Sequence, residues 1–243
     1  MTYKTKEIEF QKYKTRGAYH WEQIGKHPLR RNAFVAGRYR NVITLLEDAL
    51  SASLKGKRVL DVGCGDGALS YLLTRKGAVV FGIDNQEIAI RFAREKTKRM
   101  NIDFKVGSAY ELPWGDGTFD AVVSSDVIEH LQDTTRYLEE IKRVTKVGGV
   151  VVISTPIRFT EEPLDKMHVV EWFSDEFKKV IEGVFPKSRY LKSHPVFWFE
   201  MINRNRYCRL MVNLFSLIRN PFESFNAKFY YHALQYSVST KYK

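Results

Sequence analysis

Hydrophobic positions along the chain alternate between short apolar runs and helical spacings. The apolar runs that predict buried strands are 59–62, 79–83, 104–107, 121–124 and 150–154. Between them, stretches such as 86–99 and 134–146 carry apolar residues at helical spacing and predict helices with one buried face. Strands that alternate with helices form a mainly parallel sheet with helices on both faces. The pattern therefore predicts an α/β fold.

The N-terminal region departs from this alternation. Residues 1–37 hold aromatic side chains among Lys and Arg with little periodicity, and they read as an arm before the main domain, residues 38–243. Tyr19, His20 and Trp21 are expected to close over a site as a lid and exclude water. A packing tail is the alternative.

The C-terminal third departs from the alternation a second time. Residues 196–229 predict a helical insertion, which contains an amphipathic, arginine-bearing helix at 206–220. We expect the apolar face of that helix to pack on the sheet. The alternatives are that it roofs a pocket or that it lies on a bilayer. Residues 234–242 alternate in polarity and predict a last strand at the sheet edge.

A glycine-rich turn joins the first predicted strand to the helix after it. Glycines at 63, 65 and 67 allow positive φ and let a ligand lie against the main chain. The helix that follows presents N–H groups and a positive dipole end at the same place. This combination is typical of a nucleotide-binding turn.

The charges around the turn narrow the type of nucleotide. The glycine spacing differs from the Gly-x-Gly-x-x-Gly of dinucleotide sites, and the carboxylates of Asp61 and Asp66 would repel a pyrophosphate. Asp84 ends the next predicted strand, where a carboxylate binds ribose hydroxyls, and Asn85 adds a hydrogen-bonding group. An adenosine with a cationic tail suits these acids.

Five segments together resemble the class I S-adenosylmethionine-dependent methyltransferases, and within them the type 11 group related to ubiquinone-biosynthesis O-methyltransferases. The segments are 61–67, 82–84, 112–120, 127–131 and 148–154, in the family's order and spacing. The resemblance implies a Rossmann-like, doubly wound sheet of seven strands, mostly parallel with an antiparallel last strand. It also implies S-adenosyl-L-methionine as cofactor, S-adenosyl-L-homocysteine as product, and methyl transfer as the reaction.

The resemblance further implies which residues contact the cofactor. These are Arg40, Asp61, Gly63, Cys64, Gly65, Asp84, Asn85, Ser108, Ala109 and Ser124. Arg40 is expected to hold the methionine carboxylate, with a solvated arginine as the alternative. Ser108 stands where the family often has an aspartate that accepts from the adenine amine, so this position departs from the family's pattern.

His168 and three other ionisable residues mark the expected acceptor side. His168 follows the fifth predicted strand in a segment that resembles one in small-molecule and glycan methyltransferases. Its imidazole suits a base that takes the acceptor's proton, with a structural or substrate-orienting role as the alternative. Asp126, Glu129 and His130 gather at a helix start, where metal binding, proton movement and helix capping all suit them. We expect capping and assign no metal.

Composition indicates the class of protein and its location. With 243 residues, 44% of them hydrophobic and 28% charged, the chain is expected to form one large globular domain with a small appendage. Two cysteines argue against a disulfide scaffold, and no apolar run approaches the roughly 20 residues of a membrane span. We expect a cytoplasmic protein, with 206–220 as a peripheral contact to a membrane.

Net charge bears on the methyl acceptor. Of the total of +11, residues 1–58 carry +8 (13 basic, 5 acidic), residues 59–156 carry −2 (12 and 14) and residues 157–243 carry +5 (14 and 9). The basic ends suit an anionic acceptor, an anionic membrane or RNA, or serve solubility alone. We expect a small or lipid-linked acceptor methylated on oxygen. An RNA methyltransferase and a non-catalytic cofactor-binding regulator are the alternatives, and the sequence does not indicate an oligomeric state.

Overall fold

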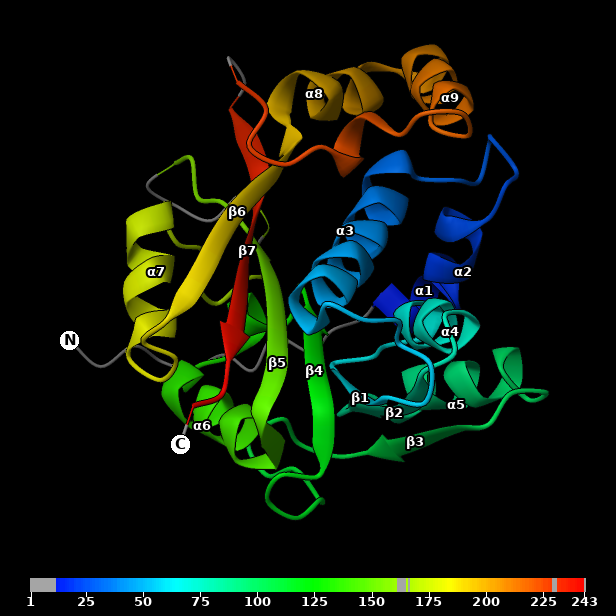
Figure 1. The fold of residues 1–243 in the computed structure, drawn as a ribbon. Coiled ribbons are helices and arrows are strands. Elements are labelled where there is room, and N and C mark those ends of the chain that lie inside the picture. The colour runs from blue at the N-terminus through cyan, green and yellow to red at the C-terminus, as the bar shows by residue number, and fades with distance from the viewer. Residues whose placement is uncertain (1–11, 161–164, 166, 229–230, 243) are drawn as a thin grey trace.

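A mixed seven-stranded sheet forms the centre of the computed structural model, which describes residues 12–160, 165, 167–228 and 231–242 (Figure 1). Residues 1–11 of the predicted arm and residue 229 of the predicted insertion lie outside the described residues. The strands are β1 (Arg58–Val62), β2 (Val79–Asp84), β3 (Ile102–Val106), β4 (Phe119–Ser125), β5 (Thr145–Pro156), β6 (Ser188–Pro195) and β7 (His232–Thr240).

The strand order is β3-β2-β1-β4-β5-β7-β6, and β1 to β5 pair in parallel. Strand β7 runs antiparallel to both β5 and β6, which confirms the expected fold class of a mostly parallel sheet with an antiparallel last strand. The edge position predicted for this strand is wrong. Val238 pairs with Val152 on one side and Arg189 on the other, so β7 lies inside the sheet and β6 forms the edge.

Helices cover both faces of the sheet. They are α1 (Lys12–Arg16), α2 (Tyr19–Ile24), α3 (Ala33–Leu50), α4 (Ala68–Arg75), α5 (Glu87–Lys96), α6 (Thr134–Val144), α7 (Ser174–Glu182), α8 (Val196–Arg204) and α9 (Arg206–Phe215), with 3-10 turns η1 (Ile128–His130) and η2 (Pro221–Glu223). On one face, α3 and α4 pack on alternate residues such as Val59 and Val123. On the other, α6 and α7 pack on Leu60 and Val122. This two-faced burial explains why the strands read as continuous apolar runs.

The helical segment between β6 and β7 lies beyond one end of these strands, next to α3 (Figure 1). Its helix α9 is oriented opposite to our expectation. Along α9 and the residues directly after it, the polar side chains of Asn213 and Ser216 are buried, whereas Met211 and Ile218 are 65% and 91% exposed. The reason is a buried polar contact: Asn213 accepts from the Ala33 N–H and donates to two carbonyls of the segment before α3. The expectation that the apolar face packs on the sheet is therefore wrong.

Candidate functional site

The glycine turn lies between the carboxyl end of β1 and the start of α4. Gly63, Gly65 and Gly67 all have positive φ, at 73°, 53° and 79°. The N–H groups of Gly63 and Cys64 both donate to the Ile83 carbonyl, which ties the turn to the end of β2. Residues with a Cβ rarely adopt this backbone, so the three glycines are required by the turn itself.

Asp84 lies beside the turn, as the sequence predicts. One carboxylate oxygen accepts from the Gly65 N–H at 2.9 Å and the other from the Gln86 N–H at 2.8 Å. Burial raises the pKa of Asp84 above its ordinary value, while these two N–H groups oppose the shift. Asn85 follows at an exposed position at the same strand end.

Asp61 is buried in the middle of the fold. Its carboxylate accepts from the Ser70 hydroxyl of α4 at 2.6 Å. Burial raises the pKa of Asp61 to about 7, while the Ser70 hydroxyl acts in the opposite direction. The Asp61 carboxylate is therefore already hydrogen-bonded to α4. The ammonium group of a bound cofactor would have to share this carboxylate with Ser70.

Cys64 does not fit the predicted role of a cofactor contact. Its side chain packs in a small cluster with Ile90, Ala93 and Phe104. Its N–H donates to the Ile83 carbonyl, and its own carbonyl accepts from the Gly67 N–H. Both the side chain and the main chain of Cys64 thus serve the turn, which sequence spacing alone does not show.

Helices α1 and α2 of the N-terminal arm lie against the turn. The space that a Cβ at Gly65 would take is filled by the hydroxyl of Tyr13, which is 5% exposed. The main-chain N–H of His20 donates to the Asp66 carboxylate at 3.0 Å, and the Trp21 indole N–H donates to the Asp66 carbonyl at 2.6 Å. Asp66 therefore anchors the arm, and Tyr13 is a residue of the site that sequence reasoning missed.

Arg40 does not reach the turn. Its side chain is 66% exposed and lies 3.4 Å from the Glu223 carboxylate. Arg38 is buried instead and pairs with Asp126, which follows β4 with a positive φ of 54°. The expectation for Arg40 is wrong because Arg38, four residues before Val42, lies on the buried face of α3. That spacing was the signal that could have found Arg38.

Of the other predicted cofactor contacts, Ser124 stabilises the fold, whereas Ser108 and Ala109 stay candidates for the site. Ser124 is buried and donates to the Val62 carbonyl at 2.9 Å, so its hydroxyl links β4 to β1 and does not face a ligand. Ser108 is exposed, and its hydroxyl accepts from the Tyr110 N–H at 3.1 Å. Ala109, half-buried beside it, packs against the core on the α6 side. Ser108 and Ala109 remain predictions for the adenine side.

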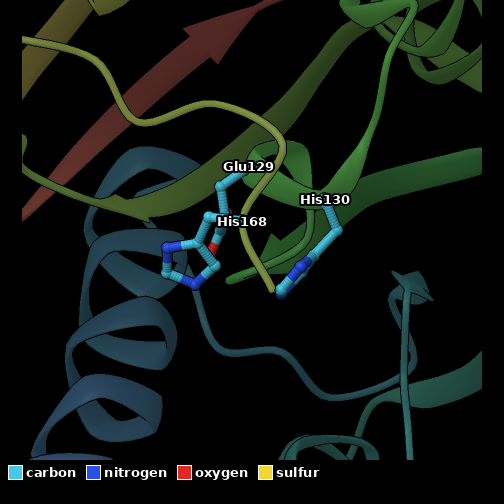
Figure 2. A group of neighbouring side chains, drawn as sticks. All are labelled: Glu129, His130 and His168. Carbon is cyan, nitrogen blue, oxygen red and sulfur yellow. The ribbon is translucent and has the colours of Figure 1, made fainter. Parts of the chain in front are cut away.

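On the expected acceptor side, three ionisable side chains gather where β4 and β5 end (Figure 2). Glu129 and His130 come from η1, and His168 comes from the loop after β5. One potential ligand atom of each lies within 4.8 Å of those of the other two. The Nδ1 atom of His168 lies 2.5 Å from the buried carboxylate of Glu171, a partner that the sequence analysis did not identify.

The turn fits S-adenosylmethionine by its own geometry. Glycine-bared main chain at Gly63 and Gly65 and the carboxylate of Asp84 meet at the carboxyl ends of β1 and β2, where open parallel sheets bind nucleotides. In this structure the Tyr13 hydroxyl occupies the space beside Gly65 that a Cβ would take.

Comparisons with known proteins agree with this arrangement. Residues 60–153 match a family model described as a methyltransferase domain. A probable S-adenosylmethionine-dependent methyltransferase from Mycolicibacterium smegmatis is 35% identical over 132 residues, 52% of this chain and 51% of that protein. A ubiquinone biosynthesis O-methyltransferase from Rhizobium etli is 36% identical over 104 residues, 42% of each protein. The chain thus spans about half, or less, of the length of these relatives.

A solved structure extends the likeness of fold. Phosphoethanolamine N-methyltransferase 2 from Haemonchus contortus, in complex with S-adenosyl-L-methionine, superposes with a TM-score of 0.67 at 18% identity. The superposition covers 98% of this chain and 60% of that one. Sheet order, glycine turn and the match over residues 60–153 therefore lead to one conclusion: the chain contains a methyltransferase domain of class I, the S-adenosylmethionine-dependent class.

Proposed function

We propose that this protein transfers the sulfonium methyl group of S-adenosylmethionine to a hydroxyl oxygen of a small or lipid-linked metabolite, such as a sugar, a glycan end or a phenol. The main support for the proposal is one observation. The glycine turn and the imidazole of His168, paired with the Glu171 carboxylate, lie at the same edge of one sheet. Ligands bind at this edge in open parallel sheets.

Each part of the cofactor side has a defined task. Gly63 and Gly65 admit the nucleoside against the main chain, and Asp84 accepts from the ribose hydroxyls. Asn85, Ser108 and Ala109 line the adenine side. When bound, the cofactor supplies an electrophilic methyl group, so the protein has to align the acceptor and exclude water.

The acceptor side supports a hydroxyl acceptor. A hydroxyl has to lose its proton as its oxygen attacks, and a base nearby assists this step. Glu171 orients the His168 ring through Nδ1 and stabilises the imidazolium that forms when Nε2 takes the proton. The name of the Rhizobium etli relative, which denotes an O-methyltransferase, agrees with this choice.

A lipid-linked acceptor is supported by the outward face of α9. Tyr207, Met211 and Leu214 are 66%, 65% and 42% exposed, and Arg206 and Arg209 lie on the same short helix. Apolar side chains beside arginines suit the headgroup region of an anionic bilayer. None of the helices in the described part of the chain has the length and apolar character that a membrane span requires.

The experiment starts with the acceptor. The purified protein is incubated with methyl-labelled cofactor and either lipid or water-soluble extracts of the source cell, and the labelled product is identified. We expect label in a metabolite ether. Label in RNA would favour the RNA methyltransferase that the basic chain ends suit, and label in no fraction would contradict an enzymatic role.

Asp84→Asn tests the cofactor side directly. We expect its affinity for S-adenosylmethionine to fall by about 10- to 100-fold, because a hydrogen bond to a charged group contributes about 1.5–3 kcal/mol. Calorimetric titration measures the change. Asp103→Asn, at an exposed position of β3, is the matched control and should bind as the original protein does. Equal affinity in the two variants would show that Asp84 does not bind ribose.

A further inference from the structure

Glu129, His130 and His168 form a cluster of three potential metal-binding side chains, whereas a base requires only one of them. Its potential ligand atoms, one from each residue, lie within 4.8 Å of one another, and the three side chains converge (Figure 2). Ligands of one ion at about 2.0–2.2 Å stand at most about 4.4 Å apart. Small side-chain movements therefore bring all three donors to one ion.

Both imidazoles are held in the manner typical of metal ligands. The Nδ1 atom of His130 lies 2.9 Å from the Met167 carbonyl, and Nδ1 of His168 lies 2.5 Å from the Glu171 carboxylate. A proton on each Nδ1 satisfies these contacts and places the lone pair of each ring on Nε2. Histidine ligands commonly donate their second ring N–H to a carbonyl or carboxylate, which fixes the ring and raises its basicity.

The carboxylate of Glu129 supplies an independent observation. Glu129 is 0% exposed, and its Oε2 accepts from the Thr155 hydroxyl at 3.0 Å. Its Oε1 is buried and has no hydrogen-bond partner among the described residues. A buried anion with an unsatisfied oxygen is costly, and a cation bound to that oxygen removes the cost.

The geometry points to a divalent transition-metal site formed by Glu129, His130 and His168. Two imidazoles and one carboxylate are the ligands that suit zinc, iron(II), manganese and cobalt, whereas magnesium and calcium prefer oxygen alone. Three protein ligands leave coordination positions for water or substrate. This replaces our expectation from the sequence, which assigned no metal because Glu129 and His130 are adjacent in the chain.

The site also gives the acceptor hydroxyl a way to ionise, an extension that rests on the proposed function. The hydroxyl oxygen binds the ion, its O–H bond breaks and the proton leaves to water, because coordination lowers the pKa of a bound hydroxyl. The oxygen then forms a bond to the methyl carbon while the carbon–sulfur bond breaks, giving an ether and S-adenosylhomocysteine. In this form His168 is a ligand of the ion, and the base role proposed for its Nε2 is not needed.

The test uses the full chain, stripped with a chelator and titrated with Co²⁺, whose visible absorption reports its ligands. We expect one ion per chain. Glu129→Gln, His130→Gln and His168→Gln should each weaken binding by at least about 10-fold, and Glu171→Gln should weaken it by about 10- to 100-fold. His27→Gln, an exposed histidine of the arm, is the control and should bind Co²⁺ unchanged.

The outcomes separate the site from the reaction. Absence of Co²⁺ binding, or binding that survives all three ligand substitutions in folded variants, would overturn the metal site. Circular dichroism of each variant shows whether it is folded, and Glu171→Gln provides a second reading without touching a ligand. Full methyl transfer by the stripped protein would overturn the ion's part in ionising the acceptor and leave the proposed function standing. If no methyl transfer occurs with or without metal, the function fails while the Co²⁺ spectrum still decides the site.

Discussion

Among single residues, Asp61 shows how burial makes the stability of the protein depend on pH. Its side chain is 2% exposed, and its charged form loses hydration that one hydroxyl contact with Ser70 replaces only in part. Burial therefore raises the pKa of Asp61 from 3.8 to about 7. Below pH 3.8 both the folded and the unfolded chain hold the proton. Between pH 3.8 and 7 only the folded chain does, so the contribution of Asp61 to stability is lost as the pH rises through this window.

Asp61→Asn should remove this dependence. We expect the variant to become more stable relative to the original protein as the pH rises from 5 to 7, by at most about 1.4 kcal/mol per pH unit. Urea unfolding at a series of pH values measures the difference. Asp103→Asn, the exposed control, should show no such trend. A constant difference between Asp61→Asn and the original protein would mean that Asp61 stays ionised in the folded state.

The sequence predicts the positions of candidate residues in the fold well where the backbone defines them. The positive-φ glycines and Asp84 follow from a turn and a strand end, and both are where they were expected. Side-chain direction is a different matter. Cys64 and Ser124 sit at the predicted edge but face the interior, and the potential ligand atoms of the adjacent residues Glu129 and His130 lie within 4.8 Å of each other, which the helical spacing of neighbours did not predict.

At the scale of elements, Asn213 fixes the orientation of α9. It is 0% exposed and makes two hydrogen bonds to the segment before α3 and a third to Ala33, the first residue of α3. Asn213→Ala leaves buried groups unsatisfied and should cost about 1–3 kcal/mol of unfolding free energy. Thermal or urea unfolding measures this loss. Asn203→Ala, at an exposed position of α8, is the matched control, and an equal effect in both variants would contradict the anchoring role.

The apolar face that this orientation exposes should bind anionic vesicles. Leu214→Glu and Ile218→Glu introduce charge at positions that are 42% and 91% exposed, so they should leave the fold intact and abolish co-sedimentation. Val147→Glu makes the same change at an exposed position of β5 and should sediment as the original protein does. Vesicle binding that persists in both the Leu214→Glu and the Ile218→Glu variant would count against a membrane-facing acceptor.

Helix position was easier to predict than helix orientation. Periodicity correctly indicated an amphipathic helix near 206–220, although α9 ends at Phe215. The rule that apolar faces turn inward failed because the buried face of α9 holds Asn213, whose three hydrogen bonds tie it to residues 28, 31 and 33. The arm showed the opposite problem: α1 and α2 are too short to produce a periodic signal, yet they contact the glycine turn.

For the molecule as a whole, the arm and the glycine turn act as one unit. We propose that the arm opens to admit the cofactor, because Tyr13 fills the space at Gly65 and Asp66 holds α2. Trp21→Phe removes the indole donor to Asp66 and should speed trypsin cleavage near the exposed Arg16.

Limited proteolysis with and without S-adenosylmethionine measures this opening. The cofactor should speed cleavage in the original protein, since it takes the space at Gly65 that Tyr13 fills in the closed arrangement. Trp114→Phe, which changes a tryptophan that packs against Phe81 and Phe119, should cleave at the original rate. Equal cleavage of Trp21→Phe and the original protein, with no effect of the cofactor, would contradict a moving lid.

The position of β7 has a consequence for how the molecule is made. Strands β5 and β6 flank a gap that only β7 fills, and β7 is separated from β6 by the whole helical segment. While the ribosome is still producing α8 and α9, one edge of β5 is open and β6 has no partner strand, so each is able to pair with a foreign strand. The nascent chain is therefore prone to aggregation until β7 has been made. A pause in translation within the helical segment would prolong this period.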